Sequence, residues 1–446
     1  FEAAFGLKGM PRPDINTING SRVFFSHVDG DGIMNASQID QTSNAGKILY
    51  EEILKKYSDL PITVSLITGY FDLPEYHTDQ IKELYKNIFS LNNIEPASHG
   101  YAHPLIWKKG TVALDIPHYQ YSADKEINGS VSRLNDLLKE LGVQKTVSLF
   151  QWTGNCLPGL DAIQIIKNSR LLNINGGDSR FDVRHDGYSW VAPLGILKEG
   201  VHQIYTAASN ENVFTNLWQG PYYGFKDVIQ TYENTERPLR VKPLNIYYHF
   251  YSAEKMAALT VLKEVYDYAR KTDIVPLFTS QYVQMAEDFY DVKIDKKAEG
   301  VFVVSENGTV KTIRFDNEKR VVDVIHSKGV LGFKTMNDSL YVYLSEGSEH
   351  EVVLSATASA HVFVNHASFM IENFKANNKK ITFFKEGWYR ENLKLAGLLA
   401  DKNYVVSEDH QSWTVKSDQR GTLNIDFKKI ENGGAATPVE ITLESL

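Results

Sequence analysis

The feature that most constrains this fold is a regular alternation of short apolar runs and longer amphipathic segments between residues 23 and 290. The apolar run "ITVSLIT", for example, is followed by the helical pattern "HTDQIKELYKNIFSL". Repeated strand and helix units predict a parallel sheet with helical crossovers. The number of runs, about seven or eight, favours an α/β fold of the distorted (β/α) barrel kind over residues 23–290.

The pattern changes after residue 291 to strands of period two with turn residues between them. In "GVFVVSENGTVKTIRF", the pair Asn307-Gly308 predicts a hairpin turn. Residues 291–446 are therefore predicted to form an antiparallel β-sandwich, jelly-roll-like in type. Residues 1–22 are predicted to be a linker that leads into the barrel.

Composition excludes several classes of function. A formal net charge of -8 offers no basic stripe for nucleic acid. No run reaches the roughly 18 to 20 apolar residues of a membrane-spanning helix, so no span is expected. The first ten residues, "FEAAFGLKGM", lack a signal core, and any targeting signal is expected upstream of Phe1. The only cysteine, Cys156, excludes an intrachain disulfide, and we interpret it as a small buried residue rather than a nucleophile.

Polar residues follow the predicted strands of the barrel. In parallel β/α folds, side chains at the carboxyl ends of strands line the ligand crevice. This rule selects the following residues: Asp29, Asp31, His99, His103, Asp178 and His249.

Each of these motifs taken alone has two interpretations. "VDGDG" is either a surface turn or a strand end that delivers two carboxylates, and it lacks the glutamate of a calcium loop because Asp40 stands at the twelfth position from Asp29. The histidines of "ASHGYAHP" can face one way over a helical turn and bind zinc with a carboxylate, or form a solvated pair. His249 beside tyrosines is either a core residue or an acid.

A long amphipathic helix is predicted to follow "YYHFY". Ser252 is the predicted N-cap, because its hydroxyl can accept a hydrogen bond from the first turn. Glu254 then lies where the helix dipole favours a negative charge.

Three motifs together resemble a known family. "SHVDGDG", "SHGYAHP" and "IYYHFYS" resemble the first, second and fifth motifs of the polysaccharide deacetylases of carbohydrate esterase family four, in the variant of the PelA-like group. The segments "NVFTNLWQGPYYGF" and "RPLRVKPLNIYYHFYSAEK" sharpen this resemblance, which runs from about Pro13 to Tyr290. It implies a barrel of the polysaccharide deacetylase type followed by a β-sandwich.

The resemblance implies a role for each motif residue. Asp31, His99 and His103 would hold a divalent metal, expected to be Zn²⁺. Asp29 would be the general base, and His249 the general acid. The adjacent aspartate pair usual in the family is replaced here by Asp29-Gly30-Asp31, which leaves the division between base and ligand open.

The third and fourth family motifs are harder to identify in this sequence. "FQWTGNCLPG" occupies the place of the third motif, and "NGGDSR" resembles the fourth only loosely. Asp178 and Arg180 are accordingly predicted to orient the catalytic residues.

Aromatic residues near the strand ends are candidates for sugar binding, because a pyranose offers apolar faces and polar edges. The alternative is that they pack the barrel or its loops. The candidates are Trp152, Tyr188, Trp190, Trp218, Tyr222 and Tyr223. Trp218 and Tyr222 are favoured because their loop also carries glycine and proline, and Trp190 is predicted with them.

The function implied by the resemblance is metal-dependent N-deacetylation of an N-acetylhexosamine-containing exopolysaccharide, Pel-like and rich in N-acetylgalactosamine, in biofilm matrix biosynthesis. Polysaccharide assembly or export proteins would be partners, and the location would be periplasmic or secreted. The alternatives are deacetylation of chitin-like or peptidoglycan chains, a non-catalytic glycan-binding or assembly role, and a glycoside hydrolase that uses paired carboxylates.

Overall fold

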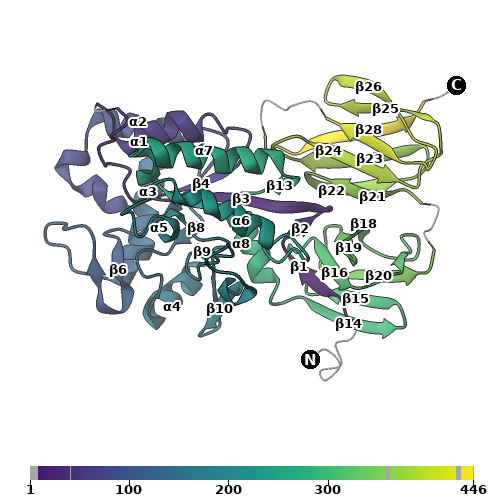
Figure 1. Cartoon of the computed structure of the whole chain (residues 1–446), viewed down its shortest axis with the longest axis horizontal. Helices are drawn as coiled ribbons and strands as arrows, with labels where there is room; N and C mark the ends of the chain where they lie inside the picture. The colour runs from purple at the N-terminus through teal and green to yellow at the C-terminus, as the bar shows by residue number, and fades with distance from the viewer. Residues whose placement is uncertain (1–8, 41, 358–360, 428–432, 445–446) are drawn as a thin grey trace.

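The computed structural model describes residues 9–40, 42–357, 361–427 and 433–444. Figure 1 shows a mixed α/β part, which holds the first half of the chain and more, beside a part made of β-strands. The two parts have separate hydrophobic cores. The helix Thr279–Asp288 is the last helix among the described residues, and the strands that follow it begin at Lys293.

The main sheet of the α/β part has the strand order β10-β11-β9-β8-β5-β4-β3-β12, and β13 and β2 also pair with β3. Neighbouring strands from β11 to β12 are parallel, as the alternation predicts. The strands are β2 (Thr17–Ile18), β3 (Ser21–Asp29), β4 (Ile62–Leu66), β5 (Ile94–Ser98), β8 (Leu149–Gln151), β9 (Leu172–Ile174), β10 (Gly195–Lys198), β11 (Val201–Ile204), β12 (Leu244–His249) and β13 (Ile274–Pro276).

Helices cover both faces of this sheet, with one buried apolar cluster on each side. In α2 (Asp79–Phe89) the Thr78 hydroxyl accepts from the Ile81 N–H, and the buried residues Leu84, Tyr85 and Ile88 recur at helical spacing. The other helices are α1 (Ala45–Leu49), α3 (Ser130–Glu140), α4 (Leu160–Ser169), α5 (Glu211–Phe214), α6 (Val228–Asn234), α7 (Met256–Lys271) and α8 (Thr279–Asp288).

The sheet is curled but open. Its described strands run from β10 at one edge to β12 at the other, and β10 pairs with β11 as an antiparallel hairpin. The architecture is therefore a mixed α/β half-barrel.

The predicted N-cap of α7 is wrong. Ser252 lies in a short 3-10 turn, Phe250–Ala253, and the helix begins only at Met256 after Lys255. The Ser252 hydroxyl donates instead to Glu211 at 2.8 Å. The Ser252 hydroxyl thus binds a buried carboxylate from another element instead of capping the helix. A contact between elements so distant in the sequence leaves no local pattern.

The β part contains three further sheets. Their strand orders are β1-β16-β19-β18-β21-β24-β27, β14-β15-β20-β17 and β22-β23-β28-β25-β26. The strands are β1 (Arg12–Asp14), β14 (Lys293–Ala298), β15 (Val301–Ser305), β16 (Thr312–Asp316), β17 (Val321–Val322), β18 (Val330–Met336), β19 (Ser339–Leu344), β20 (His350–Ser355), β21 (Phe363–Ala367), β22 (Met370–Ala376), β23 (Lys380–Glu386), β24 (Asn392–Ala396), β25 (Asn403–Glu408), β26 (Gln411–Lys416), β27 (Leu423–Asp426) and β28 (Thr437–Leu443).

The seven-stranded sheet contributes to two buried clusters. One cluster joins it to the four-stranded sheet, through residues such as Val304 and Val342. The other joins it to the five-stranded sheet, through residues such as Leu393 and Ile441. Most pairings are antiparallel, although β18 and β21 are parallel. The jelly-roll-like topology stays a prediction.

The hairpin predicted at Asn307-Gly308 is wrong. The strands on either side of it belong to different sheets, because β15 pairs with β14 and β20 whereas β16 pairs with β1 and β19. The segment therefore crosses between two packed layers. The Asn307 amide donates to the Val310 carbonyl at 2.9 Å and closes the turn locally.

The segment predicted as a lead-in contains two short strands. β1 pairs antiparallel with β16 of the β part, and β2 pairs with β3 of the main sheet. Figure 1 shows β1 beside β16, between the two parts. Buried Asp14 accepts from Arg314 at 2.8 Å across this pairing. The described part of this segment thus ties the two parts of the molecule together.

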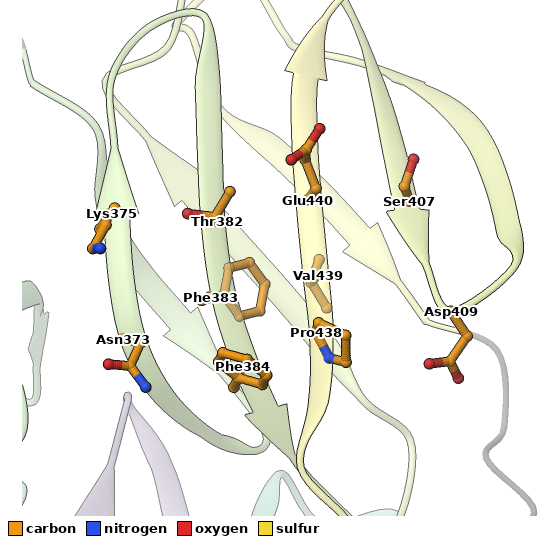
Figure 2. A pocket seen from close by; sticks show the side chains of 10 residues that line it. All are labelled: Asn373, Lys375, Thr382, Phe383, Phe384, Ser407, Asp409, Pro438, Val439 and Glu440. Carbon is orange, nitrogen blue, oxygen red and sulfur yellow. The ribbon is translucent and has the colours of Figure 1, made fainter.

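The outer face of the five-stranded sheet carries an open groove of about 590 Å³ (Figure 2). Inward side chains such as Phe383 and Val439 are buried, whereas Phe384 is 42% exposed. This alternation is what a strand with one solvated face requires. Across the described residues, no helix combines the length and apolar character needed to cross a membrane.

Candidate metal centre and catalytic site

The carboxyl ends of β3, β5, β9 and β12 meet at a polar cavity of about 300 Å³. Strand pairing explains part of this convergence, since β12 lies in register with β3 and places His249 beside Asp29. Six residues that the sequence predicts line the cavity: Asp29, Asp31, His99, His103, Asp178 and His249.

Asp31, His99 and His103 form a compact three-residue cluster. One carboxylate oxygen of Asp31 lies 3.0 Å from His99 Nε2, and the other lies 3.0 Å from His103 Nε2. The ligand atoms of the three residues all lie within 4.8 Å of one another. Two imidazoles and one carboxylate are a donor set suited to zinc and similar divalent ions.

The protonation of His99 supports this interpretation. Its Nδ1 lies 3.0 Å from the backbone carbonyl of Gln151, which can only accept a hydrogen bond, so Nδ1 carries a proton. In the neutral ring, Nε2 then presents a lone pair to the Asp31 carboxylate. Two acceptors facing each other need a cation between them, either a proton or a metal ion.

The second histidine also fits a cation site. His103 Nδ1 is buried without a hydrogen-bond partner among the described residues. Burial acts to raise the pKa of Asp31, but the charges and hydrogen bonds of His103 and His99 lower it well below its ordinary value. Asp31 is thus held as a carboxylate, which is the form that binds a metal.

A second group of possible ligands shares Asp31, because Asp29, Asp31 and His249 also converge within 4.8 Å. His249 is a poorer ligand in this structure. Burial acts to lower its pKa, but the charge and hydrogen bond of Glu211, with further contributions from Asp29 and Asp31, raise it to about 9. Its Nε2 also lies 4.0 Å from Asp31, whereas the Nε2 atoms of His99 and His103 each lie 3.0 Å from that carboxylate. The Asp31, His99 and His103 group is therefore the better candidate.

His99 and His103 face one way without the helical turn that their spacing allows. Residues 99–103 form an irregular loop after β5, and His103 has a left-handed backbone with φ 58°. The buried carboxylate of Glu126 shapes this loop. It accepts from the Tyr101 N–H at 2.8 Å and from the Ala102 N–H at 2.9 Å. The two imidazoles therefore face the same point because a distant carboxylate holds the backbone between them.

Asp29 is buried at the bottom of the cavity and is held by side chains from other strand ends. Tyr247 donates to its Oδ2 at 2.7 Å, and the Asn175 amide donates to its Oδ1 at 3.0 Å. His249 Nε2 lies 3.6 Å from Oδ2. These donors keep a carboxylate in one orientation beside the metal cluster.

A chain of hydrogen bonds extends behind Asp29. His27 Nε2 lies 3.0 Å from Asn175 Oδ1, and the Asn245 amide lies 3.2 Å from His27 Nδ1. Burial lowers the pKa of His27 to about 4, so this ring is neutral. A neutral His27 donates through Nε2 and accepts through Nδ1, which fixes the orientation of the Asn175 amide.

His249 takes its orientation from Glu211 at the start of α5. The Glu211 carboxylate accepts from the His249 backbone N–H at 2.7 Å and lies 3.0 Å from His249 Nδ1. The opposite ring nitrogen, Nε2, then points into the cavity as a proton donor. This arrangement can deliver a proton to a substrate atom.

Aromatic rings extend from His249 toward the surface. Tyr251 stacks on His249 with ring centroids 4.6 Å apart, and Trp218 lies 4.7 Å from Tyr251. Tyr222 lies 5.1 Å from Trp218. The structure thus places Trp218 and Tyr222 next to the cavity wall, while their role in substrate binding stays a prediction.

The other predicted residues lie farther from the reacting groups. Asp178 is exposed on the cavity rim. Arg180 donates to Asp182 at 2.6 Å and to the Val213 carbonyl at 3.0 Å, away from His249. Trp190 is 53% exposed and packs against His185. The orienting role predicted for Asp178 and Arg180 and the sugar contact of Trp190 stay predictions.

Cys156 lines the same cavity but is not activated. Burial raises the pKa of its thiol well above the ordinary value, and the charges of Asp29, Asp178 and Asp31 raise it further. The thiol donates to the Trp152 carbonyl at 3.3 Å. It is accordingly unsuited to act as a thiolate nucleophile.

Sequence reasoning missed Glu126, Asn175, Glu211 and Tyr247. Tyr247 stands two residues before His249 in the quoted motif, so the period of two along β12 could have placed both on one face. Asn175 follows β9 in "NGGD" and satisfies the strand-end rule. Glu126 and Glu211 carry no comparable signal, because both act from helices outside the motifs.

Comparisons with known proteins give only distant similarities. No protein-family model and no curated protein matches the sequence. Among solved structures, the chain is similar to a CE4 esterase from Streptococcus mutans (10% identity, 58% of this chain and 86% of that one, TM-score 0.31). It is also similar to a family 4 carbohydrate esterase from Bacillus anthracis (9% identity, 61% and 86%, TM-score 0.29).

A third similarity is to a protein from Parabacteroides distasonis described as a glycoside hydrolase/deacetylase (7% identity, 95% of this chain and 90% of that one, TM-score 0.39). All three TM-scores lie below 0.5, so the assignment of the site rests on this chain's own geometry. That geometry defines a candidate divalent-metal centre flanked by a buried carboxylate and a protonated histidine.

Proposed function

We propose that this protein is a divalent-metal-dependent N-deacetylase that acts on N-acetylhexosamine units of a polysaccharide. The observation that carries the proposal is the convergence of Asp31, His99 and His103 beside Asp29 and His249 in one polar cavity. These groups supply a metal site, a base and an acid, which are what hydrolysis of an unactivated amide requires.

A metal ion held by Asp31, His99 and His103 would polarise the acetyl carbonyl and lower the pKa of water from near 15.7 to about 7. Asp29 accepts the proton of the attacking water. His249 donates its Nε2 proton to the amide nitrogen as the C–N bond breaks, and the products are acetate and an amine. Tyr247 and Asn175 keep Asp29 in place during this exchange.

The dimensions of the cavity fit this substrate class. A volume of about 300 Å³ lined largely by polar side chains suits one sugar unit with its acetyl group. Trp218 and Tyr222 extend from the cavity wall and are proposed to stack on neighbouring sugars, with Trp190 farther out. Asp178 on the rim is proposed to help orient the catalytic residues.

The biological setting proposed here rests on the motif resemblance alone. The substrate is a Pel-like exopolysaccharide rich in N-acetylgalactosamine, the metal is Zn²⁺, and the location is periplasmic or secreted. Proteins of exopolysaccharide assembly or export are the proposed partners. Removing acetyl groups exposes amines and gives the polymer positive charge.

The experiment that tests this proposal measures metal content and acetate release. Purified protein is treated with a chelator, reloaded with zinc or cobalt, and incubated with N-acetylgalactosamine and N-acetylglucosamine oligomers. We expect acetate release that depends on the metal. Absence of acetate with every metal and both oligomers would rule out the enzyme assignment.

A matched pair of variants distinguishes the general base, Asp29, from the metal ligand, Asp31. Asp29→Asn should retain the metal and lower kcat by about 10²- to 10⁴-fold. Asp31→Asn should lose the metal along with activity. Full activity in Asp29→Asn would show that another group is the base.

The glycoside hydrolase alternative is less consistent with the geometry. Retaining and inverting enzymes place their carboxyl groups roughly 5 to 9.5 Å apart. One oxygen of Asp29 and one of Asp31 lie within 4.8 Å of each other, but the Asp31 carboxylate already faces His99 and His103 and is not free to act as a nucleophile or an acid. Shortened oligomers without acetate in the same assay would favour that alternative.

A further inference from the structure

A buried cation without a carboxylate partner lies far from the metal centre. Lys242 precedes β12 and is 7% exposed. Its ammonium donates to the Pro193 carbonyl at 3.3 Å, and no ion pair to Lys242 is recorded among the described residues. Burial lowers its pKa to about 8, so at neutral pH the group is still mostly charged. An ammonium with one long hydrogen bond leaves its other protons without acceptors, which is costly in a protein interior.

Lys242 lines a cavity of about 340 Å³ at the junction of the two parts of the molecule. We call it the junction cavity; the residues that define it here are Asp14, Ile15, Leu194, Lys242, Phe289 and Arg314. Its walls come from β1, from the segment before β10, from the end of α8 and from β16. Figure 1 shows β1 beside β16 between the two parts. Segments so distant in the sequence form a pocket that exists only in the folded chain.

The charges on the wall favour an anion. Asp14 also lines the cavity, but Arg314 donates to it at 2.8 Å and the Asn16 N–H donates to it at 2.9 Å. The Arg314 guanidinium and nearby Arg240 offset its charge. Lys242 has no such compensation, so the positive charge at its end of the cavity is available to a ligand.

The remaining wall is largely apolar. Ile15 is buried, and Leu194 and Phe289 pack against the cluster that contains it. An inorganic anion would contact only the charged end of the cavity and would not use the apolar part of its wall. A carboxylate that carries a short hydrocarbon tail would satisfy both the ammonium and the apolar wall.

We propose that the junction cavity binds a small aliphatic carboxylate. Its carboxylate oxygens accept hydrogen bonds from Lys242 Nζ, and its hydrocarbon tail lies against Ile15, Leu194 and Phe289. This site is separate from the metal centre and does not depend on the proposed deacetylase activity. Acetate, the product of that activity, belongs to the same chemical class.

Calorimetric titration with butyrate tests the proposal. The protein is first freed of metal with a chelator, so that butyrate cannot bind a metal ion, and ionic strength is held constant with sodium chloride. We expect one butyrate to bind per chain and butyramide, which lacks the charge, to bind at least tenfold more weakly. Equal binding of butyramide, or no binding of butyrate, would overturn the proposal.

Two lysine variants locate the site. Lys242→Met keeps the aliphatic stem and should weaken butyrate binding at least tenfold. Lys145→Met is the matched control, because the Lys145 ammonium already donates to the Leu91 and Ile94 carbonyls and does not line the junction cavity. It should bind butyrate as the wild type does. Unchanged affinity in Lys242→Met contradicts the proposal.

A crystal of the wild-type protein soaked in butyrate keeps the test decisive if Lys242→Met fails to fold. Density for butyrate within hydrogen-bonding distance of Lys242 Nζ is expected. Butyrate located only at other positions would contradict the assignment.

Discussion

At the scale of single residues, Glu211 decides the protonation state of His249. The imidazole is buried, which acts to lower its pKa, yet the neighbouring carboxylate raises it to about 9. A general acid works while it is protonated, so activity is retained below this pKa and lost as pH rises through it. The same carboxylate fixes the ring by accepting from the backbone N–H of His249.

Glu211→Gln should therefore move the alkaline limb of the kcat/KM profile to lower pH. Loss of a negative charge in direct contact is expected to lower the pKa of His249 by about 1 unit or more. The measurement is the rate of acetate release between pH 6 and about pH 10. Glu254→Gln is the control, because that carboxylate lies near Trp218 Nε1 and Asn35 rather than His249. If the alkaline limb of Glu211→Gln stays at the wild-type pH, Glu211 does not determine the pKa of the general acid.

At the scale of elements, the loop after β5 depends on a carboxylate from the segment before α3. Glu126 accepts from two consecutive backbone N–H groups between the histidines, and Tyr119 donates to it as well. Burial raises the pKa of Glu126, while these donors lower it. The loop is irregular, so its conformation depends on this support rather than on a helical ladder.

Glu126→Gln should weaken metal binding about 10- to 100-fold, since groups behind metal ligands commonly contribute this much. The amide removes one acceptor and the negative charge, so the loop between the histidines loosens. Competition with a chromophoric chelator measures the affinity. Tyr119→Phe, which leaves both backbone contacts of Glu126 in place, should change the affinity far less. Equal affinities in Glu126→Gln and wild type would show that the loop holds its shape alone.

At the scale of the whole molecule, β1 couples the half-barrel to the β part. The pairing of β1 with β16 brings buried Asp14 to Arg314, and Arg314 also donates to Asp316 at 2.7 Å. Burial raises the pKa of Asp14, whereas the charges of Arg314 and Arg240 lower it. The buried pair lies at the contact between the two parts.

Arg314→Met should lower the free energy of unfolding by about 3 to 5 kcal/mol, because it leaves a buried carboxylate without its partner. Urea unfolding followed by tryptophan fluorescence and circular dichroism measures the change. Arg320→Met is the control: its pair with Glu318 is partly exposed and should contribute about 1 kcal/mol or less. A loss in Arg314→Met no larger than in Arg320→Met would contradict the buried-pair argument.

Much of the architecture could be predicted because its causes are local. The period of apolar residues determined the parallel strands and most helices of the half-barrel, and the period of two determined the β-strands after residue 291. The strand-end rule also brought Asp29, His99 and His249 to one cavity. The predictions that were wrong concern places where a distant group competed with the local pattern. The Ser252 hydroxyl donates to Glu211 instead of capping the helix, and the strands on either side of Asn307 pair in different sheets.

The sequence by itself determined which chemical groups are available: two aspartates one residue apart, two histidines four apart, and a histidine at a later strand end. Only the tertiary structure decided what each group does. Asp31 faces two imidazoles, whereas Asp29 is held by Tyr247 and Asn175, and this difference separates a candidate ligand from a candidate base. The physical reason is that these partners lie 68 to 218 residues away in the chain, and contacts over such separations leave no local sequence pattern.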